Sequence, residues 1–323
     1  MKISIAMPTY KRLPFLKRAV ADVMAQTYTD WELVISDDEN GDGESWQWLV
    51  KLAKADNRVI IVKNEQSRHG QIWNVNNALR HCSGDWIKPL FDDDGMLPKC
   101  LETFVAIATK HPELAMIGAR AESWRNGVKV GDEADFTQSE IELIPDGLEA
   151  RKAMCLYDTW NGRTPTHVMI RGDVVRRGAV MVEDDEFKHP LDVRWFGRIL
   201  EHGGMGFSNQ VLVQERQGET ASGTSELWTQ EGFLTEELRR VYREIYMRAK
   251  EREDISNWPS LKAIDAQICG VRGLYHLTKK QIPWAIKYLS RLMIMPTAWP
   301  LVLRWLKAKC KPGFYTATER IKG

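Results

Sequence analysis

The sequence contains few cysteines and no long apolar run. Its five cysteines are spread over 323 residues and include no C-x-x-C pair, so the pattern indicates neither a disulfide framework nor a zinc site. No stretch reaches the roughly 18 consecutive apolar residues of a membrane-spanning helix. The N-terminal apolar run is too short for a secretory signal peptide. These absences predict reduced thiols and a cytoplasmic protein.

Two glycine-rich phosphate-binding motifs are also missing. No G-x-G-x-x-G follows the first predicted strand, and no G-x-x-x-x-G-K-[ST] occurs in the chain. Both motifs wrap backbone N–H groups around phosphates. Their absence argues against a dinucleotide-dependent dehydrogenase and against a P-loop enzyme. A bound diphosphate would have to depend on a metal ion and on side chains.

The formal net charge of +1 hides an asymmetry along the chain. Residues 279–323 contain ten Lys/Arg and one acid, a charge of +9, so the remaining residues carry −8. The overall balance does not indicate nucleic-acid binding. Within 283–311, aromatic and aliphatic residues alternate with basic ones, which is typical of an amphipathic helix at an anionic membrane surface. The segment predicts either peripheral attachment to the inner face of the cell membrane or packing on the acidic remainder.

Apolar runs rich in β-branched residues alternate with segments of helical spacing over the first 120 residues. The predicted strands are 3–7, 31–36, 58–62, 85–91 and 114–118. The predicted helices between them are 13–26, 44–55, 71–82 and 98–110. This alternation predicts βαβ units, and therefore an α/β fold whose mainly parallel sheet carries helices on both faces. A charged amphipathic helix is expected over 225–250.

Polar clusters follow three of the predicted strands: PTYKR (8–12), DDENGDG (37–43) and DDDG (92–95). Ligands of open parallel sheets bind beyond the carboxyl ends of the strands. Three adjacent carboxylates, Asp92, Asp93 and Asp94, oppose compact folding unless a cation neutralises them. Oxygen ligands suit Mg²⁺ or Mn²⁺, which one or two carboxylates hold together with substrate phosphates. The cluster predicts such a site, with a solvated acidic turn as the alternative.

The order and spacing of these motifs carry a family resemblance. The stretch ISIAMPTYKRLPFLKRAVADVMAQTYTDWELVISDDENGD, followed by GDWIKPLFDDDGMLP, resembles the nucleotide-sugar-binding half of family 2 inverting glycosyltransferases, which have the Rossmann-like GT-A fold. The resemblance implies that residues 1–120 form this half of the domain. It also implies an acceptor-binding half over 121–222 and a helical C-terminal extension over 223–323 that ends in the basic tail.

The resemblance implies where the nucleobase binds. Pro8, Thr9 and Tyr10 form the loop that lines the base pocket in this family. Asp37, at the end of the second strand, would accept a hydrogen bond from the ring N–H of uracil. A turn aspartate without a ligand is the alternative for Asp37.

The resemblance also implies how the rest of the donor is held. Asp92 would contact the ribose, and Asp93 or Asp94 would hold the Mn²⁺ or Mg²⁺ that bridges the diphosphate. Arg68 and Asn76 match the stretch that approaches the nucleotide.

Sugar transfer also needs a general base that accepts the proton of the attacking hydroxyl. The sequence HPLDVRWFGRIL (189–200) predicts a helix that Asp192 opens, either as this base or as a helix N-cap. The resemblance favours the base, because the base of this family commonly precedes a D-x-R-[FW]-[FW]-x-R-like helix. Glu183, Asp184 and Asp185 remain the alternatives.

A further cluster indicates acceptor binding. Trp160, Asn161, Arg163 and His167 precede an apolar strand, and aromatic and amide groups suit the apolar face and the hydroxyls of a sugar. A buried structural histidine is the alternative for His167.

Together these features predict a metal-dependent glycosyltransferase that moves a sugar from a UDP-sugar to the hydroxyl of a glycan or a lipid-linked glycan in bacterial surface polysaccharide synthesis. Two alternatives stay open. A sugar-phosphate nucleotidyltransferase is disfavoured because PTYKRLP contains no glycine. A nucleotide-sugar-binding protein without catalysis is disfavoured by the full set of acidic residues.

Overall fold

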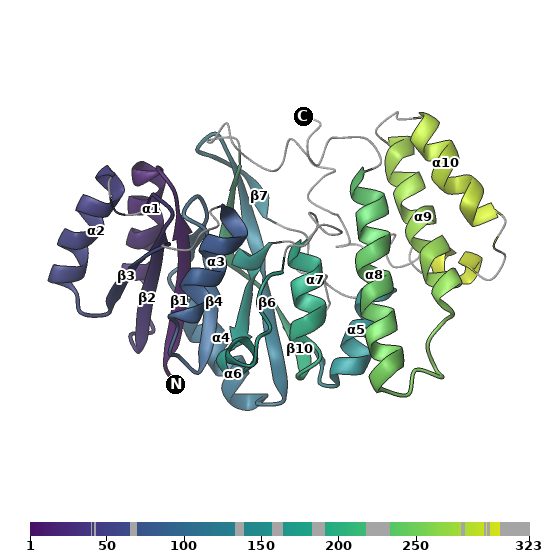
Figure 1. Ribbon diagram of the computed structural model, residues 1–323, viewed down its shortest axis with the longest axis horizontal. Coiled ribbons are helices and arrows are strands. Elements are labelled where there is room, and N and C mark those ends of the chain that lie inside the picture. The colour runs from purple at the N-terminus through teal and green to yellow at the C-terminus, as the bar shows by residue number, and fades with distance from the viewer. Residues whose placement is uncertain are drawn as a thin grey trace.

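The chain forms one large sheet flanked by helices, with three further helices at one end of the molecule (Figure 1). The computed structural model describes residues 1–39, 41, 43–64, 70–132, 139–156, 164–182, 191–217, 233–278, 282–293, 295 and 298–303. Within these ranges the ten-stranded sheet has the order β3-β2-β1-β4-β9-β6-β10-β5, with β7 beside β6 and β8 beside β10.

The first four strands are parallel, as the sequence predicted. They are β1 (Ile3–Thr9), β2 (Trp31–Asp37), β3 (Val59–Lys63) and β4 (Trp86–Pro89). The helices between and after them are α1 (Leu13–Met24), α2 (Glu44–Ala55), α3 (Gln71–Arg80) and α4 (Cys100–Lys110). The predicted α/β alternation is therefore confirmed over this part of the chain.

Beyond β4 the sheet is mixed. Strand β9 (Val168–Arg171) lies antiparallel between β4 and β6 (Leu114–Arg125), and β10 (Gly204–Gln217) runs parallel to β6. Short antiparallel strands complete the sheet: β5 (Gly95–Met96), β7 (Val128–Asp132) and β8 (Ile141–Ile144). The two halves that the sequence predicts therefore share one continuous sheet.

Two hydrophobic cores cover the two faces of the sheet. On β1, Ile3, Ile5 and Met7 pack into the core that contains residues of α1, α2 and α4. Ala6, whose side chain points to the other face, packs into the core that contains residues of α3 and of the later helices. This alternation follows from the two-residue period of a strand, and it places helices on both faces as predicted.

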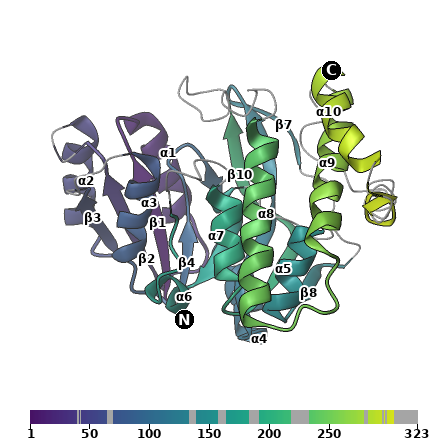
Figure 2. The same ribbon diagram turned by 45° about the vertical axis from the view of Figure 1, so that its right-hand side comes forward.

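The C-terminal region is helical. Its elements are α8 (Phe233–Arg252), α9 (Leu261–Thr278) and α10 (Ile282–Met293). Helix α8 packs against α7 (Leu191–Ile199) and α5 (Gly147–Cys155), and α9 and α10 lie on the outer side of α8 (Figure 2). Among the described helices, none is long and apolar enough to cross a membrane.

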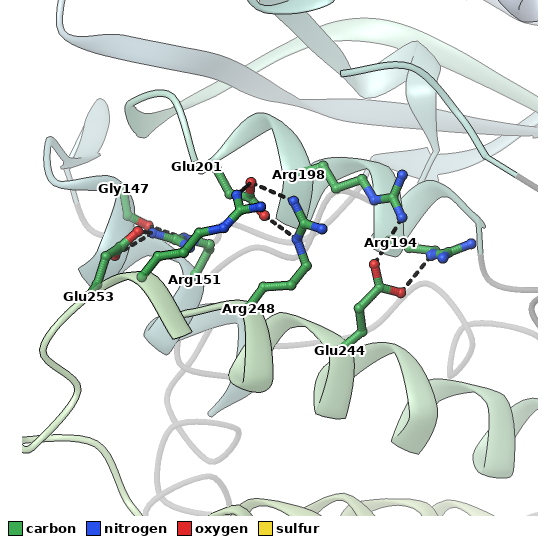
Figure 3. A network of polar contacts seen from close by, with 9 residues as sticks. Gly147, Arg151, Arg194, Arg198, Glu201, Glu244, Arg248 and Glu253 are labelled. Carbon is green, nitrogen blue, oxygen red and sulfur yellow. Dashed lines mark hydrogen bonds and ion pairs between the residues drawn. The ribbon is translucent and has the colours of Figure 1, made fainter. Parts of the chain in front are cut away.

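Ion pairs fasten α8 to α7. The carboxylate of Glu244 on α8 accepts hydrogen bonds from Arg194 at 2.7 Å and from Arg198 at 3.0 Å, both on α7 (Figure 3). Arg194 is buried and also donates to the carbonyl oxygen of Val182 at 3.0 Å. Removal of one partner of a buried ion pair lowers the free energy of unfolding, so the carboxylate of Glu244 is expected to stabilise the fold through Arg194. We name the contact of Glu244 with these two arginines the α7–α8 clamp.

Further pairs extend this contact along α8. Arg248 donates to both carboxylate oxygens of Glu201, which follows α7, and Glu253 accepts from Arg151 of α5 at 2.7 Å (Figure 3). Arg252 reaches the same Glu201 at 2.8 Å, but its side chain is 55% exposed. The C-terminal helices are therefore bound to the part of the chain that carries Asp192.

Removing the α7–α8 clamp should destabilise the protein. Glu244→Ala is expected to lower the free energy of unfolding by about 3 kcal/mol, because the variant removes the carboxylate that faces two guanidinium groups, one of them buried. Urea denaturation followed by circular dichroism measures this difference.

Arg252→Gln on the same helix is the matched control. It removes an exposed ion pair, so its cost should stay below about 1 kcal/mol. Equal losses from the two variants would contradict a special role for the α7–α8 clamp.

Candidate active site

The polar clusters of the first strands meet at one edge of the sheet. Thr9 ends β1 and lies in register with Asp37, which ends the neighbouring β2. The hydroxyl of Thr9 donates to Asp92, three residues beyond the end of β4, at 2.7 Å. Because β1, β2 and β4 are parallel, their carboxyl ends lie together. Thr9 and Asp92, which belong to two of the polar clusters noted in the sequence, are therefore in direct contact.

Asp37, the last residue of β2, is fully buried. Its carboxylate accepts hydrogen bonds from the backbone N–H groups of Glu39 at 3.2 Å and Gly41 at 3.3 Å. Burial raises the pKa of Asp37, and the two N–H groups offset part of that effect. Nearby, Pro8 lies buried within β1, whereas the ring of Tyr10 is 51% exposed. Tyr10 directly follows Thr9, which is the register partner of Asp37 on β1.

The first two carboxylates of the acidic triplet, Asp92–Asp94, share one cation. Arg12 donates to Asp93 at 3.1 Å and lies 3.5 Å from Asp92. Burial, together with repulsion from Asp93, raises the pKa of Asp92 to about 6 although Thr9 and Arg12 act in the opposite direction. Arg12 is a site residue that the sequence prediction missed, although it belongs to the PTYKR cluster.

The third carboxylate, Asp94, is buried among partners that come from distant parts of the chain. Thr166 donates its hydroxyl to Asp94 Oδ2 at 2.6 Å, and the backbone N–H of Arg216 donates to Oδ1 at 3.2 Å. Burial and the neighbouring Asp93 raise the pKa of Asp94 to about 8. The guanidinium of Arg216 bonds the carbonyl oxygen of Asp94 at 2.9 Å and pairs with Asp22. No motif in the sequence indicates that Thr166 or Arg216 belongs to this site.

The acidic triplet fits a hard divalent cation. Its donors are all oxygen, and burial raises the pKa of both Asp92 and Asp94, so a nearby cation would favour their ionised forms. The Asp93 side chain, at 29% exposed, is the most accessible of the three. Across the described part of the chain, no three His, Cys, Asp or Glu side chains converge into a metal cage. Mg²⁺ and Mn²⁺ do not need one, since substrate phosphates complete their coordination.

Asn76 is buried and engaged elsewhere. Its amide nitrogen donates to the carbonyl oxygen of Met181 at 2.7 Å, and its amide oxygen accepts the N–H of Met181 at 3.0 Å. These two bonds connect α3 to the segment that follows α6 (Gly172–Arg176) in the chain. The neighbouring Asn74 instead donates to the carbonyl oxygen of Thr9 at 3.0 Å. The structure therefore gives Asn76 a bridging contact between two segments of the chain.

Asp192 lies in the first turn of α7, as predicted from the sequence. Its Oδ1 accepts the N–H of Val193 at 2.9 Å, and burial raises its pKa to about 6. A carboxylate with a raised pKa is suited to accept a proton near neutral pH. The alternative bases Glu183, Asp184 and Asp185 lie outside the described residues.

Of the predicted acceptor residues, His167 falls within the described part of the chain. It is fully buried in the 3₁₀ turn Pro165–His167, and its Nδ1 lies 2.9 Å from the hydroxyl of Thr164. This burial fits the structural alternative better than direct contact with a sugar. Trp160, Asn161 and Arg163, and Arg68 of the donor prediction, lie outside the described residues.

In an open α/β sheet, ligands bind beyond the carboxyl ends of the parallel strands, and the acidic triplet lies at this edge. The family model of glycosyl transferase family 2 matches residues 4–177. The chain belongs to this family.

Curated relatives match parts of the chain. A beta-1,3-glucosyltransferase of Campylobacter jejuni named for GalNAc(5)-diNAcBac-PP-undecaprenol is 31% identical over 34% of this chain and 35% of the relative. The Escherichia coli glucosyltransferase WfgD, named for UDP-Glc and an alpha-D-GlcNAc-diphosphoundecaprenol, is 30% identical over 36% of this chain and 44% of the relative. The Bacillus subtilis putative glycosyltransferase EpsE is 25% identical over 66% and 71%. The chain thus spans well under half the length of the first and second of these relatives.

Solved structures show the same fold. Staphylococcus aureus TarS 1–349 in complex with UDP-GlcNAc has a TM-score of 0.64 at 15% identity. The superposition covers 95% of this chain and 81% of the TarS chain. The mannosyltransferase PcManGT of Pyrobaculum calidifontis, in complex with GDP-Man and Mn²⁺, has a TM-score of 0.55 at 14% identity, with coverage of 96% and 81%. These similarities confirm the predicted GT-A fold.

Proposed function

We propose that the protein is an inverting glycosyltransferase that moves a sugar from a UDP-sugar to an acceptor hydroxyl. The observation that carries this proposal is the acidic triplet at the carboxyl edge of the parallel sheet, held by Thr9 and Arg12. Membership of glycosyl transferase family 2 supports it. UDP is proposed as the nucleotide because a solved structure of the same fold binds UDP-GlcNAc.

In this proposal the first half of the sheet binds the donor. Tyr10 stacks on the uracil ring, and Asp37 accepts the hydrogen bond of its N–H group. Asp92 contacts the ribose, while Asp93 and Asp94 are the residues that would hold Mg²⁺ or Mn²⁺. When bound, this cation stabilises the charge that develops on the departing diphosphate. The predicted division into a donor half (1–120), an acceptor half (121–222) and an extension (223–323) belongs to the same proposal.

Asp192 is proposed as the general base. Its carboxylate takes the proton of the acceptor hydroxyl as the hydroxyl oxygen bonds the anomeric carbon and the bond from that carbon to the diphosphate oxygen breaks. One displacement inverts the configuration at that carbon. The raised pKa of Asp192 makes its carboxylate a better proton acceptor than an exposed aspartate.

The acceptor is proposed to be a lipid-linked glycan, and α10 to be a contact with the membrane that holds it. The names of two relatives carry undecaprenol-linked acceptors. One face of α10 packs on the protein, because Ala285, Tyr288 and Leu292 are buried. A stripe beside this buried face exposes Ile282, Ile286 and Met293, at 50%, 64% and 71%. An apolar stripe of this kind inserts into the interface of a bilayer.

Binding of UDP tests the donor site and its metal. Calorimetric titration of UDP is expected to give binding in the presence of Mn²⁺ that falls at least about tenfold in EDTA and in Asp93→Asn or Asp94→Asn, because both variants remove a carboxylate charge from the cation site. Asp30→Asn, which changes an exposed aspartate at 60% exposure, is the control and should bind as the wild type does.

Equal UDP affinity with Mn²⁺ and with EDTA would contradict metal dependence. The absence of measurable binding of UDP, GDP and dTDP would contradict the proposed donor site. Hydrolysis of a UDP-sugar without acceptor would separate an enzyme from a protein that only binds the nucleotide sugar.

Turnover should depend on ionised Asp192. Because burial raises its pKa to about 6, the fraction of ionised base falls as the pH drops below about 6, so kcat at saturating donor and Mn²⁺ should fall there and level off above pH 7. Asp192→Asn should reduce kcat by roughly 10²–10⁴-fold at pH 8, with UDP affinity unchanged. Release of UDP from the donor in the presence of acceptor measures the rate.

The same assay on Glu183→Gln, Asp184→Asn and Asp185→Asn tests the alternative bases. A loss of that size in one of these variants, with Asp192→Asn near wild-type activity, would assign the base to that residue instead.

Membrane contact through α10 can be tested with vesicles of mixed neutral and anionic lipid. Ile286→Glu should weaken co-sedimentation at least about tenfold, because it removes an apolar side chain from the interface and adds a charge that anionic lipid repels. Val128→Glu on β7 is the matched control, since Val128 is 65% exposed and lies outside α10. Equal binding of the two variants would overturn this part of the proposal.

A further inference from the structure

A lysine lies fully buried beneath the acidic triplet. Lys88 is on β4, four residues before Asp92, and its side chain has no exposed area. Lysine is almost never fully buried unless its ammonium group is paired. Burial lowers the pKa of Lys88 to about 8, while the nearby Cys100 and Asp94 act in the opposite direction. Such a residue in a central strand needs an explanation.

The ammonium group of Lys88 holds one particular turn of the chain. It donates to the carbonyl oxygen of Pro89 at 2.8 Å and to the carbonyl oxygen of Thr166. Thr166 is 1% exposed and belongs to the 3₁₀ turn Pro165–His167, which directly precedes β9. Lys88 therefore fixes the main chain of this turn against the end of β4.

Thr166 contacts both Lys88 and the acidic triplet. While its carbonyl oxygen accepts from Lys88, its hydroxyl donates to Asp94 Oδ2 at 2.6 Å and accepts the N–H of Phe91 at 3.4 Å. The N–H of Arg216 donates to the other carboxylate oxygen of Asp94. These bonds use two of the roughly four lone-pair positions of a carboxylate, so Asp94 can still offer oxygen to a cation.

We propose that Lys88 and Thr166 are positioning residues that aim the Asp94 carboxylate at the cation of the nucleotide diphosphate. The inference rests on the proposed function, because it assigns a supporting layer to the same site. Groups that hydrogen-bond a ligating carboxylate fix its orientation, and their loss typically weakens metal affinity by 10–100-fold.

The test removes the Thr166 hydroxyl while keeping the shape of the side chain. Thr166→Val should weaken the affinity for Mn²⁺ in the presence of UDP at least about tenfold, measured by calorimetry. The weak UDP affinity that remains in EDTA should not change. Thr166→Ser keeps the hydroxyl and should bind Mn²⁺ as the wild type does. Thermal denaturation of each variant verifies that it is folded.

A second variant tests whether Lys88 acts on Asp94 through Thr166. Lys88→Met has a similar length and no charge, and it should weaken Mn²⁺ affinity in the same direction. If both residues act through Asp94, the double variant Lys88→Met/Thr166→Val should lose little more affinity than the weaker-binding single variant. If the two substitutions acted independently of each other, their fold losses of Mn²⁺ affinity would multiply in the double variant.

The outcomes separate this inference from the proposed function. The positioning role is overturned if folded Thr166→Val binds Mn²⁺ with wild-type affinity, or if the losses of affinity multiply in the double variant. Either result leaves the proposed donor site intact. Wild-type protein that binds UDP equally with Mn²⁺ and with EDTA overturns the cation site, and this inference with it.

Discussion

The site depends on three adjacent carboxylates kept at a largely buried edge of the sheet. Desolvation and mutual repulsion both oppose their ionisation, as the raised pKa values of Asp92 and Asp94 show. The protein offsets this with Thr9 and Arg12 from the end of β1, and with contacts to Asp94 from the turn before β9 and from β10. The mixed half of the sheet thus serves the site directly, because it brings distant donors to the triplet.

A second set of charges fixes the helix that carries Asp192. Arg194 joins Glu244 on α8 to the carbonyl oxygen of Val182, while Asn76 on α3 holds Met181 through both its amide atoms. Met181 is therefore held by Asn76 of α3, and Val182 by Arg194 of α7, which pairs in turn with Glu244 of α8. Helix α8 thus contributes to the placement of the helix that carries Asp192.

Local features were predictable from the sequence, and long-range polar contacts were not. The β1, β2, α1 and α2 segments follow from apolar periodicity and from turn residues, and the observed bounds differ from prediction by two residues or fewer. Contacts of Asp94 span 72 residues to Thr166 and 122 to Arg216, and no spacing rule connects such residues. Lys88 within an apolar strand normally indicates a surface position. Asn76 fitted the family motif, yet its amide bonds Met181, which only the folded chain reveals.

In the proposed function, the balance of charge at the triplet also sets how the donor and the cation bind. Arg12 contacts Asp92 and Asp93, while the guanidinium of Arg216 is engaged with Asp22, so the cluster stays negative. A nucleotide diphosphate adds further negative charge at the same place, and repulsion opposes its binding alone. A divalent cation alone finds one or two carboxylates and needs phosphate oxygens to complete its shell. Each ligand therefore raises the affinity for the other by the same factor. The protein supplies enough positive charge to fold, and it leaves the remainder to the cation that accompanies the substrate.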